Sequence, residues 1–164
     1  MKKLFIILML FTAIVQAQEK ISIGIYQDGK LSFMKDNHGN IPFTPDVIIT
    51  VNLEGNQFKY YYFSIQPFYE FADLYGGKFH RYGFNTNWNF NHLIIPNTTI
   101  VLGAGLGSIV RENYGSLSYQ ANLEIRHKLL KWLEISIRTE LVRRTELQTP
   151  QFKPNLSYGF VFNF

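Results

Sequence analysis

The sequence contains no cysteine, so no disulfide holds the fold and no thiol takes part in chemistry. After the N-terminal segment it also lacks any run of roughly eighteen consecutive apolar residues, the length that a transmembrane helix needs. There is no basic stripe, so binding to nucleic acid is not expected. If the chain enters a membrane, it must do so as a closed β-barrel, because only a barrel satisfies all strand backbone groups in lipid.

Motifs for catalysis and for cofactors are missing as well. The four histidines, His38, His80, His92 and His127, lie on different segments without metal-ligand spacing. The glycine-rich GAGLG at 103–107 does not open a helix after a strand, so it fails as a phosphate-binding loop. The sequence therefore predicts no catalytic residue, no metal site and no cofactor.

The first 17 residues are typical of a secretory signal peptide. Lys2 and Lys3 precede an apolar run at 4–15, which is too short for a membrane-spanning helix, and 15–17 form a loose cleavage site. Removing 17 of the 164 residues would leave 147, which suits one domain over 18–164. The loss of two lysines and no acid would lower the net charge from +4 to +2.

The remainder reads as short segments in which apolar and polar residues alternate, separated by turn residues. Alternation with a period of two is the pattern of β-strands, because successive side chains point to opposite faces. We predict eight strands, at 19–27, 46–54, 58–72, 81–91, 100–110, 117–126, 133–141 and 156–164. The sequence therefore indicates an all-β protein.

The composition of the two strand faces indicates which one points outward. Between residues 81 and 126 there is no lysine, and the polar face combines glycine, asparagine and charges of both signs, which suits a narrow closed interior better than a solvated surface. The other face would overfill a barrel of about eight strands. It carries Tyr61, Phe63, Tyr69, Phe71, Tyr82, Phe84, Trp88, Phe90, Tyr158, Phe160, Phe162 and Phe164.

The spacing of the loops agrees with a membrane barrel. Counted from an N-terminus in the periplasm, the outer loops would be 28–45, 73–80, 112–116 and 144–154, and the inner turns 54–57, 93–98 and 127–131. The outer set is longer on average, as in outer-membrane barrels. We therefore predict a closed, antiparallel, up-and-down, eight-stranded transmembrane β-barrel.

With these features, and above all with its last strand YGFVFNF, the chain resembles the small eight-stranded outer-membrane β-barrels of Gram-negative bacteria, of the OmpA membrane-domain and OmpX type. The likeness covers 19–164 as a pattern and is not a residue-by-residue match. It implies an outer-membrane location, contact with membrane lipid and lipopolysaccharide, and a monomer. It also implies an assembly signal, read by the barrel-assembly machinery, at Tyr158, Phe160, Phe162 and Phe164.

Some barrels of this size modify lipid A, but their features are missing here. The deacylase type carries a His-x-Ser pair, whereas His127 is followed by Lys128 and Leu129. The palmitoyl-transferring type has a helix before its first strand, and only residues 18–20 stand between the expected cleavage site and that strand. A non-enzymatic protein is the expectation.

The polar faces of the sixth and seventh predicted strands carry charges of both signs. Glu124, Arg126, Glu134, Arg138 and Glu140 would meet in the lumen, with Arg126 opposite Glu134 and Arg138 near Glu124 on the diagonal. Because eight strands leave little free channel, this cluster is expected to plug the lumen rather than gate it.

The expected role is envelope integrity or surface interaction, with the long loop 28–45 exposed at the cell surface. Three alternatives stay open: a narrow pore for small solutes, a lipid A-modifying enzyme, and a soluble exported barrel that binds an apolar ligand inside. The last of these requires the aromatic face to point inward.

Overall fold

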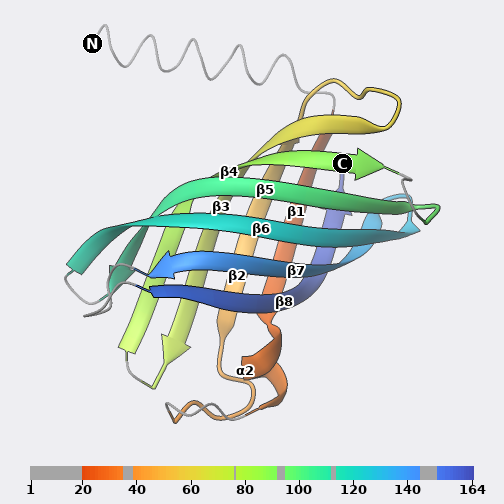
Figure 1. Ribbon diagram of the computed structural model, residues 1–164. Coiled ribbons are helices and arrows are strands. Elements are labelled where there is room, and N and C mark those ends of the chain that lie inside the picture. Colours follow the sequence, from red (N-terminus) through yellow and green to blue (C-terminus); the bar gives the residue numbers. More distant parts are fainter. Residues whose placement is uncertain (1–19, 35–38, 76, 92–94, 112–113, 145–150) are drawn as a thin grey trace, which may run out of the picture.

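A computed structural model describes residues 20–34, 39–75, 77–91, 95–111, 114–144 and 151–164. The predicted signal peptide lies outside the described residues. The described residues form one closed barrel and one short helix (Figure 1). Its elements are β1 (Lys20–Asp28), α2 (Gly29–Phe33), β2 (Asp46–Glu54), β3 (Tyr61–Leu74), β4 (Gly77–Asn91), β5 (Thr98–Arg111), β6 (Tyr114–Leu130), β7 (Leu133–Arg144) and β8 (Gln151–Asn163).

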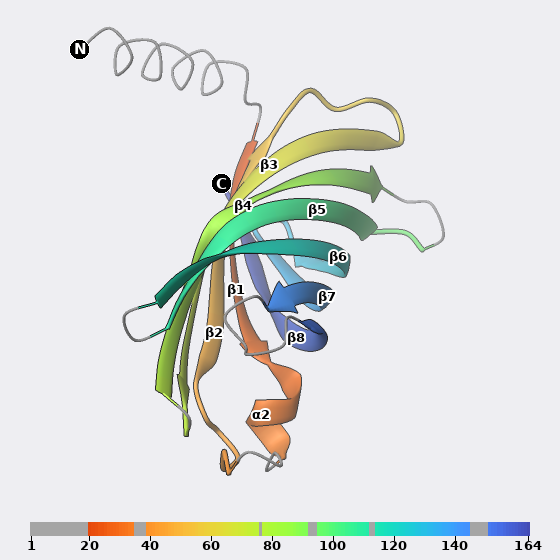
Figure 2. The ribbon, with the colours of Figure 1, turned by 60° about the vertical axis from the view of Figure 1, so that its left-hand side comes forward.

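The topology is the simple up-and-down barrel that the sequence predicts. Each strand pairs antiparallel with the next, and β8 closes the barrel by pairing with β1, where Ile25 lies opposite Phe160. The start of β1 and the C-terminus lie at one end of the barrel, and α2 lies at the other (Figures 1 and 2). We call these the terminal end and the helix end.

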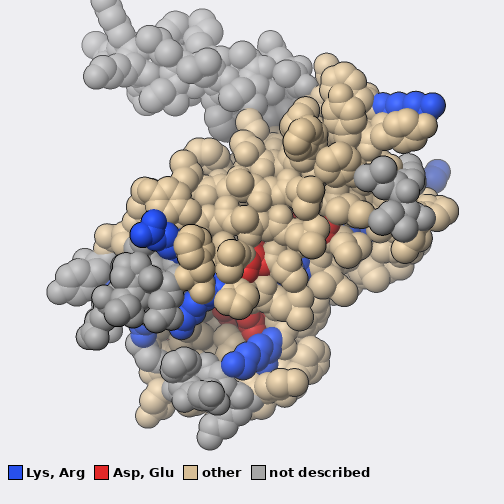
Figure 3. Space-filling view, in the orientation of Figure 1, with Lys and Arg blue, Asp and Glu red and all other residues tan. Residues whose placement is uncertain are grey.

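The facing of the strands is as predicted. Large apolar side chains cover the outer surface, including Phe63, Trp88, Ile137 and Phe160, which are all exposed. Uncharged residues make up most of the face in Figure 3, and the basic side chains lie mainly near the two ends of the barrel. This outer surface suits contact with acyl chains, since its apolar side chains need no hydrogen bonds from water.

The interior holds most of the buried polar residues, but it is not wholly polar. Ala72, Phe79 and Ile109 form a small apolar layer toward the helix end, and Tyr26 packs inside against two other apolar residues. The buried rings of Tyr26 and Phe79 lie at strand positions that alternate with the outward residues. A few aromatic side chains therefore point into the lumen, and the others point outward.

Several predicted loops are wrong because the strands continue into them. Only β2 has the predicted limits; β4 begins at Gly77 and β6 begins at Tyr114, inside the expected outer loops 73–80 and 112–116. The cause is visible in the β3–β4 hairpin, where Asp73 pairs with Lys78 in the ladder and by an exposed ion pair of 3.7 Å. Polar residues on both faces end the alternation while the backbone pairing goes on.

The helix α2 was not predicted, since five residues are too few to show a helical period. Asp28 ends β1 and caps the helix, because its Oδ1 accepts a hydrogen bond from Leu31 N at 2.6 Å. Leu31 and Ser32 are buried against the barrel, and the Met34 N–H donates to Lys30 O. Among the residues that the structure describes, no helix is long and apolar enough to cross a membrane.

One glycine is required where the barrel closes. Gly159 of β8 lies opposite Tyr26 of β1, and a Cβ at this position would come within 2.1 Å of Ile25 O and 2.8 Å of the Tyr26 Cα. Both of those atoms are backbone, so no side chain could move aside. The two strands can approach this closely only without a side chain at residue 159.

Candidate functional site in the barrel lumen

A chain of six charged side chains crosses the lumen, with acid and base alternating along it. Every member is at most 4% exposed, and the three glutamates balance the three arginines. In order of contact the chain is Glu70, Arg81, Glu140, Arg138, Glu124 and Arg126. The lumen therefore carries no net charge from this cluster.

Arg81 of β4 connects three strands. Its Nε donates to Glu70 Oε2 of β3 at 2.5 Å, and its Nη2 donates to Glu140 Oε2 of β7 at 2.7 Å. Its Nη1 donates to Gln120 Oε1 of β6 at 2.5 Å. The ring of Phe68 lies 5.0 Å from the guanidinium carbon, so the cation is also covered on one side by an aromatic ring.

Arg138 of β7 holds the middle of the chain. Its Nη2 lies 2.5 Å from Glu140 Oε1, and its Nη1 donates to Gln66 Oε1 at 2.9 Å. Nη1 also lies 3.8 Å from Glu124 Oε2, so this one side chain joins the two carboxylates. Arg138 is fully buried, and charges in such a place need partners of this kind.

Glu124 of β6 is surrounded by donors. Its carboxylate accepts from Arg126 Nε at 2.7 Å and Nη2 at 3.0 Å, from Tyr26 OH at 2.7 Å and from Ser136 Oγ at 2.7 Å. With its amide oxygen turned to the guanidinium, Asn52 accepts from Arg126 as well, at 2.7 and 2.8 Å. The acceptor capacity of this buried carboxylate is thus largely used by the protein itself.

Three amide side chains complete a ring across the lumen. Asn85 Nδ2 donates to Gln66 Oε1 at 3.0 Å, and Gln120 Nε2 donates to Asn85 Oδ1. Since Gln66 contacts Arg138 and Gln120 contacts Arg81, the amides link the two arginines on one side while Glu140 links them on the other. The ring draws on β3, β4, β6 and β7.

Four of the five predicted cluster residues meet in this network, namely Glu124, Arg126, Arg138 and Glu140. Glu134 does not: it lies at the terminal end, where its Oε1 accepts from Asn163 Nδ2 at 3.0 Å.

The predicted pairing of Arg126 with Glu134 is wrong. Ser136 lies opposite Arg126, Lys128 lies opposite Glu134, and Arg138 lies directly opposite Glu124 rather than on the diagonal. The reason is that β6 continues to Leu130, which pairs with Leu133, so the turn lies later in the chain than predicted and Arg126 faces a residue two positions further along β7.

Glu70, Arg81 and Tyr26 were missed, although the sequence held a signal for the two charged residues. Arg81 lies four residues before Asn85 on β4, so both side chains point inward. Glu70 lies four residues after Gln66 on β3, so these two side chains also share the inward face. Following the polar face of every strand to its end would have placed both charges in the lumen. The ladder pairs Glu70 directly with Arg81.

Hollows lie on both sides of the network. At the terminal end a polar hollow of about 370 Å³ is lined by residues that include Lys20, Glu54, Lys128 and Glu134. At the helix end a smaller hollow of about 130 Å³ reaches Glu70 and Arg81. The charged chain therefore stands between a wider and a narrower mouth.

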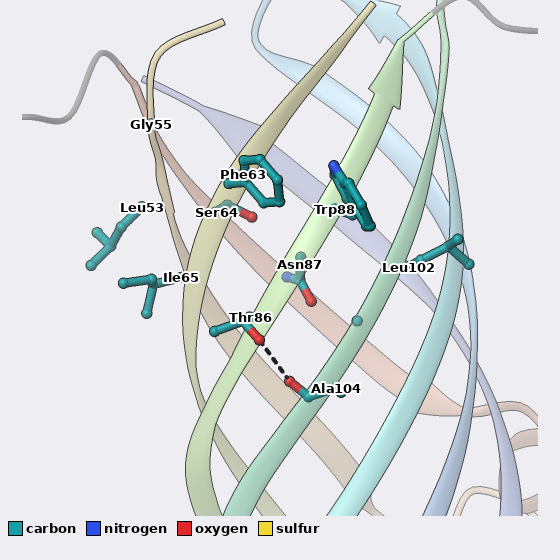
Figure 4. Close-up of a pocket in the computed structure, with 11 residues that line it drawn as sticks. Leu53, Gly55, Phe63, Ser64, Ile65, Thr86, Asn87, Trp88, Leu102 and Ala104 are labelled. Carbon is teal, nitrogen blue, oxygen red and sulfur yellow. Dashed lines mark hydrogen bonds between the residues drawn. The ribbon is translucent and has the colours of Figure 1, made fainter.

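An apolar groove of about 600 Å³ lies on the outer surface rather than in the lumen (Figure 4). Its sides are large residues such as Phe63, Trp88 and Leu102, and it lies over the small residues Thr86 and Ala104, which are ladder partners. Thr86 Oγ1 donates to Ala104 O at 3.3 Å, which satisfies its hydroxyl. The soluble-barrel alternative requires an apolar cavity inside, and the facing of the strands is the opposite.

Comparison with known proteins gives the same architecture. No family model matches the sequence, and no curated protein matches it. Among solved structures, the outer-membrane protein Ail of Yersinia pestis in a phospholipid bilayer nanodisc aligns with a TM-score of 0.58 at 12% identity, over 88% of this chain and 99% of that one. The chain has the transmembrane β-barrel fold.

Two further structures share this transmembrane-barrel fold. The crystal structure of Ail, the attachment invasion locus protein of Yersinia pestis, aligns with a TM-score of 0.54 at 16% identity, over 88% of this chain and 97% of that one. A de novo designed transmembrane β-barrel aligns with a TM-score of 0.51 at 6% identity, over 90% and 96%. At these identities the likeness extends to the fold alone.

Proposed function

We propose that this chain is a non-enzymatic, monomeric outer-membrane β-barrel protein with a plugged lumen, and that it serves envelope integrity or surface interaction. The observation that carries the proposal is the ring of interlocked side chains between β3, β4, β6 and β7. Its acids and bases engage one another, which suits a structural plug better than catalysis on a substrate. The apolar outer wall supports contact with outer-membrane lipid and lipopolysaccharide.

Surface interaction has support from the helix end. There the segment from α2 to β2 is the longest connection between two strands, and rigid barrels carry their binding functions on such loops. Ail, which shares the fold, is named as an attachment invasion locus protein. We extend to this chain only the general role of a surface protein.

The plug is tested by conductance. The purified chain, in a planar lipid bilayer, is expected to show no stable current, because six paired charges and three amides occupy the middle of the lumen. Its folded state is checked by a band whose mobility in a gel changes on boiling. Stable, ion-selective current steps would instead favour the second candidate, a narrow pore, which the polar hollows at both ends would suit.

The lipid A-modifying alternative has a separate readout. Lipid A from cells with and without the gene is expected to give the same mass spectrum. A change in acylation that depends on the gene would contradict a non-enzymatic role.

The proposed assembly signal is tested at the C-terminus. Residues Tyr158, Phe160 and Phe162 point outward on β8, and Phe164 follows that strand with its N–H donated to Ile21 O at 3.0 Å. Deleting Phe164 is expected to lower the amount of heat-shifted barrel in outer membranes several-fold. Phe152→Ala, at an exposed aromatic near the other end of β8, is the matched control. Equal levels for both variants would contradict a role of Phe164 in assembly.

A further inference from the structure

The helix α2 lies against the outer face of the barrel wall. Tyr158 of β8 points outward beside Ile137, and its hydroxyl donates to Ser32 Oγ at 3.2 Å while its ring stacks on Phe33 at 5.8 Å. Gly29 lies close to the backbone of Leu156, another outward residue. The chain therefore turns outward at the end of β1 and lies over β8, instead of folding across the mouth of the lumen.

The segment after α2 is fixed to the same side. Gln27, at an outward position near the end of β1, donates from Nε2 to Thr44 O at 3.1 Å. The Phe43 N–H donates to Leu31 O at 2.9 Å, which ties the segment to the helix. Phe43 has a φ of 66°, a conformation that is uncommon for a residue with a side chain. These contacts hold the segment in place, while the Phe43 side chain stays exposed.

On the free face of this unit, most of the described side chains are apolar. Phe33 is 69% exposed and Phe43 is 81% exposed, and Met34 and Ile41 are exposed as well. Lys30 precedes Phe33 by three residues, so it shares the exposed face of the helix. A long basic side chain next to exposed rings is the combination found where a protein meets the headgroup region of a membrane, because the stem stays in apolar surroundings and the ammonium reaches the phosphates.

The wall continues beyond the helix. Further along β8 toward the helix end, Phe152 still points outward and is exposed. The unit formed by α2 and 41–43 is thus continuous with an apolar surface that extends past it along the strand. We propose that this unit is an interfacial anchor, which inserts Phe33, Met34, Ile41 and Phe43 into the membrane leaflet at the helix end. The inference rests on the proposed function, in which the outer wall faces lipid.

The test places a fluorescent reporter in the unit. Trp88 and Trp132 are replaced by phenylalanine in the full chain, and Phe33→Trp or Phe43→Trp is then added, so that each variant has one reporter. The variants are purified from membranes and placed in phosphatidylcholine vesicles that contain brominated acyl chains. A chain with Trp132→Phe alone reports from the wall at Trp88, which is 48% exposed. Asn56→Trp, in the exposed turn between β2 and β3, is the aqueous control.

We expect the Phe33→Trp and Phe43→Trp reporters to lose emission to brominated lipid as the Trp88 reporter does, most strongly when bromine lies near the carbonyl end of the acyl chain. Aqueous iodide is expected to quench Asn56→Trp and to spare the two reporters. If iodide quenches both reporters while brominated lipid quenches only Trp88, the anchor is wrong and the membrane barrel stands. If brominated lipid leaves Trp88 unquenched in a heat-modifiable protein, the proposed function fails and the anchor fails with it.

Discussion

Arg138→Ala is expected to lower the free energy of unfolding by about 3–5 kcal/mol, the range for removing one partner of a buried ion pair. The substitution leaves Glu140 without its 2.5 Å contact and removes the link to Glu124. It also removes the donor to Gln66, so the ring across the lumen opens. The measurement is the midpoint of denaturant unfolding in detergent micelles, followed by tryptophan fluorescence and by the heat-dependent gel shift.

Arg143→Ala is the matched control for this prediction. Arg143 lies on the same strand and is exposed, with its guanidinium 5.9 Å from the Tyr119 ring, so its loss should cost no more than about 1 kcal/mol. The double variant Arg138→Met with Glu140→Met removes both charges and should recover part of the stability lost in Arg138→Ala. Equal stability of Arg138→Ala and Arg143→Ala would show that the buried network contributes little.

Gly159→Ala is expected to destabilise the barrel at its closing seam by about 1–3 kcal/mol, the usual cost of forcing a methyl group into a packed site. The added Cβ would overlap Ile25 O and press on the Tyr26 backbone, so β1 and β8 would have to separate. This seam joins the first and last strands, and hydrogen bonds lost there leave unpaired backbone groups in the membrane. Refolding yield into micelles, read from the heat-shifted band, should fall together with the unfolding midpoint.

Gly115→Ala is the matched substitution at an open site. A Cβ at residue 115 meets nothing within 4 Å, although this glycine also lies within a strand. The same change in chemistry is thus made without overlap, and stability should stay within about 0.5 kcal/mol of the parent chain. A loss at Gly115 as large as that at Gly159 would attribute the effect to the general cost of replacing glycine in these strands.

The fold could be predicted from the sequence because a membrane barrel imposes alternation on every strand that spans it. In β8 the large rings alternate with smaller residues, and this alternation indicated which face of the strand points outward; the same rule held for β3 and β4. The limits of the hairpins could not be predicted in this way. Beyond the apolar part of the wall, the pairing of Asp73 with Lys78 needs only backbone hydrogen bonds. The sequence there no longer alternates between apolar and polar residues.

The interior was only partly predictable. The alternation along each strand identified which residues point inward. It did not predict contacts such as that of Arg81 with Glu140, because these residues lie 59 positions apart on strands that are not neighbours. Register added a second obstacle, since β6 continues to Leu130 and the turn to β7 lies later in the chain than the sequence indicated. The helix α2 depends on one cap at Asp28 and on contacts with β8, and neither leaves a periodic pattern in five residues.

The order of charges in the lumen has a consequence for insertion into the membrane. Glu70 and Arg81 lie opposite each other on the β3–β4 hairpin, and the other four charges, two acids and two bases, all lie on the β6–β7 hairpin. The lumen charges of each hairpin are therefore balanced within that hairpin, so neither hairpin has to bring an uncompensated buried charge into the low-dielectric layer. The contact between Arg81 and Glu140 then joins two sets of lumen charges that are each balanced already, so bringing the hairpins together does not have to neutralise a buried ion.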